Sequence, residues 1–133
     1  MCQIGDIIII KKYKDRGEMQ HQHAFLVISE EQGKINNIPY NINCNVISAF
    51  KDEDHKIRKM RSPGNFPIVL DAYDVEMGNS NEGYIKADQI FYFQKENIEY
   101  EVIGKVASDK FNSLLAFILE SEFEILDITE NIY

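Results

Sequence analysis

Two histidines, His21 and His23, stand at the entrance to a strongly apolar segment, residues 24–29. Imidazole is the side chain whose ordinary pKa lets it both accept and donate a proton near neutral pH. Side chains two apart on an extended chain point to the same face, so both rings can serve one site if the strand extends through them. The pair predicts general acid–base catalysis; the alternative is two polar surface residues at the mouth of a strand.

Short apolar runs rich in β-branched residues predict the strands that would position these histidines. Residues 6–11 and 24–29 are expected to be buried strands. Residues 41–50 alternate, with Ile42, Cys44, Val46, Ser48 and Phe50 on one face. Further short strands are expected at residues 66–72, 84–86, 89–94 and 100–106.

Polar segments between these runs predict the connections. We expect a loop at residues 12–20, a turn at 30–37, a long charged connection at 51–64 and a loop at 78–83. In the charged connection, His55 is expected to be exposed. The Asp88-Gln89 pair is expected to play a structural role at a turn.

One helix is expected, beginning at a cap formed by Ser108 or Asp109 and ending near Glu120. Its apolar stripe follows the helical period and consists of Phe111, Leu114, Leu115 and Ile118. Many short strands and one clear helix predict a mainly β (α+β) fold, either a small barrel or a sandwich. We expect a single domain over residues 1–122, followed by an acidic and apolar tail over 123–133.

The chain has 133 residues and two cysteines, Cys2 and Cys44. It is long enough to bury a core without disulfides or metal, and no Cys/His spacing typical of a zinc site occurs. Free thiols suit a reducing cytoplasm. The four consecutive isoleucines at 7–10 are too few to cross a bilayer, so we expect no membrane association.

The net charge of −8 is unevenly distributed. Residues 1–70 have a balance of +2 and residues 71–133 a balance of −10, which together give −8. Nine of the 14 basic residues fall in two stretches, Lys11, Lys12, Lys14 and Arg16, then Lys51, Lys56, Arg58, Lys59 and Arg61. Because salt screens distant charges, an anion can dock on such a locally basic surface; the alternative is two solvated loops.

Six short motifs, in this order, resemble the MazF/PemK family of ribonuclease toxins over about residues 4–119. The motifs are Gly5-Asp6-Ile7-Ile8, the strand at 23–28, Ile47-Ser48, Pro67-Ile68-Val69-Leu70, the segment 83–90 ending in Asp88-Gln89-Ile90, and Ile103-Gly104-Lys105-Val106.

The resemblance implies an SH3-like β-barrel with accessory helices, including a C-terminal amphipathic helix, and usually a homodimer. The family's typical member is a toxin, paired with an antitoxin protein, that cleaves single-stranded RNA without a metal or other cofactor. The ribose 2′-OH attacks the neighbouring phosphate and leaves a cyclic phosphate and a 5′-hydroxyl end. Ser48 matches the family's catalytic Thr/Ser position; the alternative is a buried serine bonded to backbone.

One departure concerns the Arg-Pro that the family usually carries before its second strand. Here His23-Ala24 takes that place, and no arginine is closer than Arg16. We expect His23 and His21 to supply the base and acid for 2′-OH attack. The RNA phosphates would be bound by basic side chains, and Tyr13 would stack on an unpaired base. The predicted basic contacts are Arg16, Lys56, Arg58, Lys59 and Arg61.

Two functions therefore follow from the sequence. The first is a toxin-like, cytoplasmic endoribonuclease with His21, His23 and Ser48 at its centre. The alternative is a catalytically degenerate binding module that regulates a protein or nucleic-acid partner, which the missing arginine and the acidic second half favour. The tail either forms an extra edge strand or short helix, or covers the basic groove.

Overall fold

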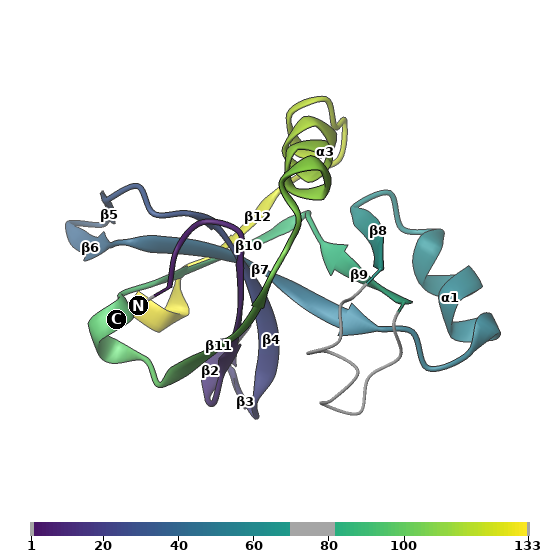
Figure 1. Cartoon of the computed structure of the whole chain (residues 1–133). Coiled ribbons are helices and arrows are strands. Elements are labelled where there is room, and N and C mark those ends of the chain that lie inside the picture. The colour runs from purple at the N-terminus through teal and green to yellow at the C-terminus, as the bar shows by residue number, and fades with distance from the viewer. Residues whose placement is uncertain (1, 70–81, 133) are drawn as a thin grey trace.

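The computed structural model describes residues 2–69 and 82–132, which are built mainly of β-strands (Figure 1). The strands are β1 (Asp6–Ile10), β2 (Tyr13–Asp15), β3 (Glu18–Gln20), β4 (His23–Ser29), β5 (Gly33–Ile35), β6 (Ile38–Tyr40), β7 (Ile42–Ala49), β8 (Asn65–Val69), β9 (Glu82–Lys86), β10 (Gln89–Phe93), β11 (Tyr100–Lys105) and β12 (Leu126–Ile128). The helices are α1 (Glu53–Met60) and α3 (Ser108–Leu119), with 3₁₀ turns η1 (Lys95–Asn97) and η2 (Glu130–Ile132).

Eight of the strands form one sheet, and the long strand β7 organises it. On one side β7 pairs with β4, which is followed by β1 and then β11, all antiparallel. On the other side residues 42–44 pair with β10 and residues 47–49 pair with β9, which also pairs with β8. Within the described residues the pairing does not close into a barrel. The predicted mainly β fold with accessory helices is confirmed.

The change of partner along β7 comes from a bend between β9 and β10. Ala87 and Asp88 form the turn at this bend, as the sequence predicted for the Asp88-Gln89 pair. The fully buried Asn45 lies opposite the bend and donates from Nδ2 to the Gln89 carbonyl at 2.8 Å. This side chain therefore supplies a hydrogen bond where the ladder is interrupted.

The two faces of the sheet carry two separate cores. Along β1, Ile8 and Ile10 enter one core and Ile7 and Ile9 enter the other, so the isoleucine run is buried on both faces. The first core is rich in aromatic rings and also contains both cysteines, which are free thiols. The second lies under α3, whose Leu114 is fully buried.

Two segments that the sequence predicts as a loop and a turn form small hairpins instead. β2 pairs with β3 around Arg16 and Gly17, and β5 pairs with β6 around Asn36 and Asn37. All four residues have positive φ angles, between 49° and 88°. Two successive left-handed residues form the tight turns that match the twist of paired strands. These turn residues were the signal that the sequence analysis missed.

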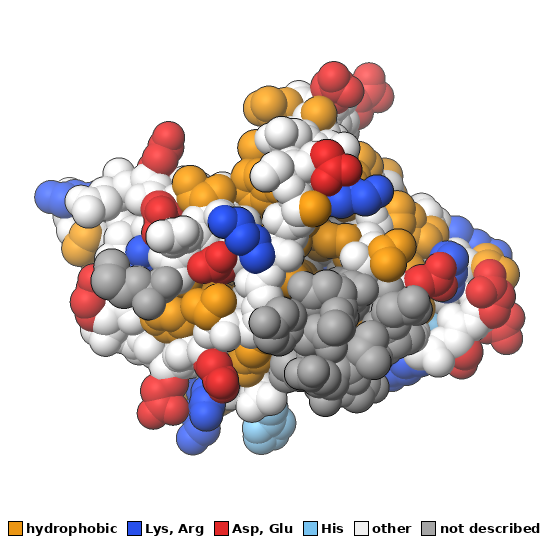
Figure 2. All heavy atoms as spheres, viewed as in Figure 1, with side chains coloured by type: hydrophobic (Ala, Val, Ile, Leu, Met, Phe, Trp, Pro, Cys, Tyr) orange, Lys and Arg blue, Asp and Glu red, His pale blue; other side chains and the backbone are white. Residues whose placement is uncertain are grey.

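The charged connection at 51–64 was predicted without regular structure, but it contains the helix α1. Asp52 caps it by accepting a 2.7 Å hydrogen bond from the His55 backbone amide. Acidic residues follow in the first turn and basic residues in the last, the arrangement that the helix dipole favours. Charged side chains of both signs cover this end of the molecule (Figure 2). Few residues of this helix are apolar, so it lacks the apolar stripe used for helix prediction, which explains the error.

The predicted helix near the C-terminus is confirmed as α3, although its cap differs. Its N-cap residue is Ala107, without a side-chain hydrogen bond, and Glu120 follows its last residue. The helix projects from the sheet (Figure 1), and its last residue Leu119 is 85% exposed. Neither α3 nor any other helix in the described part of the chain is long and apolar enough to span a bilayer.

The C-terminal tail joins the sheet as an edge strand and a short turn, the first of the two predicted arrangements. β12 pairs in parallel with β10, and Ile128 and Ile132 are buried. The predicted strand 66–72 is present as β8 up to Val69. Residues 70–72 and most of the predicted loop 78–83 lie outside the described residues, whereas Glu82 and Gly83 belong to β9.

Candidate functional site

His23 and Ser48 face each other on neighbouring strands. His23 begins β4, and Ser48 is the penultimate residue of β7. Because Ala24 pairs with Ile47, these two residues are the next facing pair of the antiparallel ladder. The His23 Nε2 lies 3.3 Å from the Ser48 Oγ, within hydrogen-bonding distance. The sheet register thus brings together two of the three predicted catalytic residues.

The same row continues onto β9, where Tyr84 pairs with Ser48. The Tyr84 side chain is only 3% exposed and stacks on Phe50, with 5.1 Å between ring centroids. Facing residues in a ladder project to one side of a sheet. The imidazole, hydroxyl and phenol therefore lie on one surface, and the packed tyrosine makes its end rigid.

A cleft of about 540 Å³ opens over this row, and we call it the His23 cleft. The sheet contributes His23, Ser48 and Tyr84, and the α1 region contributes Lys51, His55 and Lys59. Gln22, Ile9, Ala24, Ile47 and Ala49 complete the lining. Among the described residues, the charged side chains that line the cleft are both lysines, so the lining favours an anion.

Lys86 extends this basic character, and sequence reasoning did not identify it. It lies two residues after Tyr84 on β9 and thus on the same face. Partial burial lowers the pKa of Lys86 from its ordinary 10.5, and the charges of Lys59 and Arg16 lower it further, while Asp15 and Asp88 act in the opposite direction. The alternation of Tyr84, Ile85 and Lys86 was the available signal.

The surroundings of His23 favour its neutral form. Partial burial lowers the pKa of His23 from its ordinary 6.5, and the charge of Lys86 lowers it further, whereas hydrogen bonding to the Ile47 backbone raises it. A neutral imidazole has one nitrogen with a free lone pair, and the tautomer decides which one. His23 is therefore suited to accept a proton at neutral pH.

His55 was predicted to be exposed, but it is only 8% exposed and lines the His23 cleft. Its Nδ1 accepts a 3.0 Å hydrogen bond from the Lys51 backbone amide. Burial lowers the pKa of His55, as do the neighbouring charges of Arg58, Lys59 and Lys51. His55 and Lys59 are four residues apart on α1, so the helix directs both toward the cleft. The unrecognised helix explains why this residue was missed.

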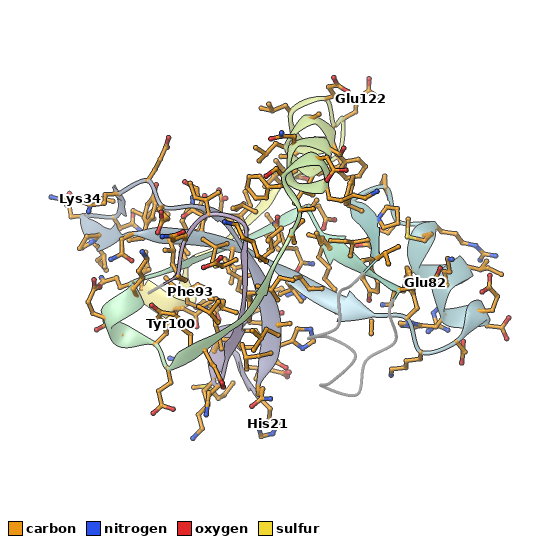
Figure 3. All side chains as sticks on the ribbon, in the orientation of Figure 1. His21, Lys34, Glu82, Phe93, Tyr100 and Glu122 are labelled. Carbon is orange, nitrogen blue, oxygen red and sulfur yellow. The ribbon has the colours of Figure 1, made fainter. Side chains whose placement is uncertain are left out.

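His21 does not join His23. The strand β4 begins at His23, and His21 is exposed outside it and does not line the cleft. Figure 3 shows its ring at the lower edge of the molecule. The condition for a shared site, a strand extending through both histidines, is not met. Within the described residues, the second imidazole of the cleft is His55.

The predicted basic contacts are dispersed. Lys59 lines the His23 cleft, and Arg58 lines a neighbouring one. Arg16 is at the tip of the β2–β3 hairpin, where its Nε lies 3.0 Å from Asp15 Oδ1. Lys56 lies 3.5 Å from the Glu82 carboxylate, and Arg61 is exposed just after α1. The structure therefore places two of the five along one line of clefts.

Tyr13 lies in the aromatic core, not on the surface. Its side chain is 8% exposed and packs edge-on against Phe25 and Phe91, with ring centroids at 4.9 and 5.7 Å. A ring enclosed in this way is not available to stack on a base, which corrects the sequence prediction. Burial raises the pKa of the Tyr13 hydroxyl.

The described residues contain no group of three or more His, Cys, Asp or Glu arranged to hold a metal ion. The acidic run 52–54 has a structural explanation, because it caps and begins α1.

Comparison of the chain with protein-family models, curated proteins and solved structures gives no match.

Proposed function

We propose that this protein is a metal-independent endoribonuclease that cleaves single-stranded RNA by attack of a ribose 2′-OH. The observation that carries the proposal is the His23–Ser48 pair, 3.3 Å apart, in a cleft lined by lysines. A proton acceptor beside an anion-binding surface is what this reaction needs. The motif order over residues 4–119, which resembles the MazF/PemK family, supports the same chemistry.

In the proposed reaction, neutral His23 accepts the proton of the 2′-hydroxyl. The 2′-oxygen then forms a bond to phosphorus, and the bond from phosphorus to the 5′-oxygen breaks. Lys86 donates a proton to the departing oxygen, since its lowered pKa makes its ammonium group a better acid than an ordinary lysine. The products are a 2′,3′-cyclic phosphate and a 5′-hydroxyl end.

Two further residues have supporting roles. Ser48 orients the His23 ring through its hydroxyl, which also faces the cleft. Lys59 and Lys86 stabilise the negative charge that grows on the phosphate, the role that the resemblance assigns to an arginine. The stabilising positive charge thus comes from lysines on α1 and β9, and not from an arginine at the start of the second strand.

The broader identity is part of the same proposal. We infer a toxin of the MazF/PemK type, with an SH3-like β-barrel fold, a homodimeric state, an antitoxin protein as partner and a cytoplasmic location. The buried free cysteines agree with a reducing compartment. The described strands pair in an open order, and we propose that the complete chain closes them into a barrel.

The test is cleavage of a 5′-labelled single-stranded RNA in EDTA by the wild-type protein, His23→Ala and His21→Ala. We expect cleavage with a cyclic phosphate product, and a loss of at least about a hundredfold in His23→Ala. His21→Ala is the matched comparison, because its ring is exposed outside the cleft. Absence of cleavage by the wild type over a broad set of RNAs would overturn the nuclease and leave the regulatory binding module.

A further inference from the structure

A second cleft, of about 320 Å³, adjoins the His23 cleft, and Lys59 lines both. We call it the Asp88 cleft. Cationic and neutral polar side chains share its walls with one carboxylate. The lining consists of Arg58, Lys59, Ser62, Asn65, Lys86, Asp88 and Gln89. A polymer bound at His23 that continues past Lys59 enters this second cleft.

The position of Asp88 in this cleft is well defined by its surroundings. The amide of Ala87 donates a 2.9 Å hydrogen bond to the Gly64 carbonyl, and the amide of Leu126 donates one of 2.8 Å to the Asp88 carbonyl. The Asp88 side chain lies directly over Gly64, where a Cβ would collide with it. The missing side chain of Gly64 therefore leaves room for the Asp88 carboxylate, which the β9–β10 bend directs over it.

The carboxylate of Asp88 makes no hydrogen bond or ion pair with any residue that the structure describes. It stands among Arg58, Lys59 and Lys86 in a cleft otherwise suited to a phosphate. A carboxylate repels phosphate, so a site for an anion alone does not explain it. Its charge acts on Lys86, but its oxygens accept no hydrogen bond from a described residue, so they are open to a ligand that brings N–H groups together with negative charge.

Guanine meets this requirement better than the other common bases. Its N1–H and 2-amino group are adjacent donors on one edge and match the two oxygens of a carboxylate. Adenine and cytosine place a single amino group beside an acceptor, and uracil places one N–H between two carbonyls. We propose that Asp88 binds the N1–H and 2-amino edge of a guanine whose adjoining phosphate lies against Lys59 and Lys86.

That the guanine belongs to single-stranded RNA rests on the proposed function, whereas the choice of base rests on Asp88. The experiment therefore measures binding without cleavage. Affinity is measured by fluorescence anisotropy with 2′-O-methyl pentanucleotides, in which the methyl group blocks 2′-OH attack. The central base, flanked by uridines, is guanine, inosine (hypoxanthine), adenine, cytosine or uracil. All measurements share one salt concentration, because phosphate contacts depend strongly on salt.

We expect the guanine oligonucleotide to bind at least about tenfold more tightly than the adenine oligonucleotide. Inosine should lose most of this advantage, because it lacks the 2-amino group. Asp88→Asn should abolish the guanine preference without weakening the adenine complex. Lys59→Met should weaken binding of all five oligonucleotides to a similar degree. Asp109→Asn is the matched control, because it makes the same change at an exposed position on α3.

Equal affinity for all five oligonucleotides, or a guanine preference that survives Asp88→Asn, would overturn the assignment. Free 5′-GMP is added as a competitor, and displacement at the concentration of the oligonucleotide's own Kd would overturn the RNA assignment in favour of a free nucleotide. The two proposals fail separately. A guanine preference without cleavage rejects only the nuclease, and cleavage without a guanine preference rejects only the role of Asp88.

Discussion

The His23 ring and the Ser48 hydroxyl are joined across β4 and β7, with 3.3 Å between Nε2 and Oγ. Twenty-five positions separate them in the sequence, so the antiparallel register alone makes them neighbours. A slip of one residue between these strands would turn His23 to the opposite face of the sheet. The geometry of the proposed site is therefore as rigid as the sheet, whose central strands are buried on both faces.

Replacing the Ser48 hydroxyl tests how much it contributes to orienting His23. Ser48→Ala should lower kcat/KM for RNA cleavage by about tenfold, the equivalent of one lost hydrogen bond of about 1.4 kcal/mol. Ser48→Thr keeps the hydroxyl and should retain most of the activity. An alanine variant as active as the wild type would show that the 3.3 Å contact has no role in turnover.

The pH dependence of cleavage follows from the two shifted groups. His23 must be neutral to accept a proton, so activity should fall as the pH drops through its pKa, and that limb should lie below 6.5. Lys86 must be protonated to donate, so activity should fall again at a pH below 10.5. The measurement is kcat/KM for RNA against pH. An acidic limb above 6.5 would exclude His23 as the base.

The charge of Lys86 can be separated from its proton. Lys86→Met removes a cation that lowers the His23 pKa, so this pKa should rise. NMR titration of the imidazole signals measures it. Lys86→Arg keeps the charge but does not release a proton at these pH values. It should leave the pKa of His23 low while still losing cleavage; full activity in Lys86→Arg would show that Lys86 contributes charge only.

The cap of α1 should matter for both stability and the cleft. Asp52→Ala removes the 2.7 Å hydrogen bond to the His55 amide and should cost about 1 kcal/mol of unfolding free energy. It should also weaken RNA binding, because α1 carries His55 and Lys59. Asp54 lies in the same first turn but does not cap the helix, so Asp54→Ala should lower the unfolding free energy by less. Urea denaturation of both variants makes the comparison, and equal losses would contradict the capping role.

The C-terminal turn holds the β2–β3 hairpin in place. Asn131 Oδ1 accepts a 2.7 Å hydrogen bond from the Lys14 amide, and its Nδ2 donates at 3.0 Å to the Lys14 carbonyl. Asn131→Ala should therefore cost about 1 kcal/mol and speed hydrogen exchange at the Lys14 amide. Amides of β1 should exchange as before and serve as the internal reference. Unchanged exchange at Lys14 would show that the hairpin is held by other contacts.

Local patterns in the sequence were sufficient to predict the main strands and α3. The isoleucines of β1 form a short apolar run, which fits a strand buried on both faces. The alternation along residues 42–46 and the stripe containing Leu114 follow the periods of a strand and a helix that bury one face. The tail was likewise expected as an edge strand or short helix. The helix α1 was missed because its residues are mostly polar and charged, so no apolar pattern marks it.

The candidate site depended on contacts that no local pattern records. The sequence by itself singled out His23 and Ser48, but as members of a set that also contained His21 and Tyr13. Only the tertiary structure decided that His21 lies outside the cleft and Tyr13 in the core, and that Lys86, His55 and Asp88 belong to the clefts. The physical reason is that strand register, helix docking and burial are set by pairing and packing between distant segments. Residue type determines which chemistry a side chain can perform, and the fold determines which side chains meet.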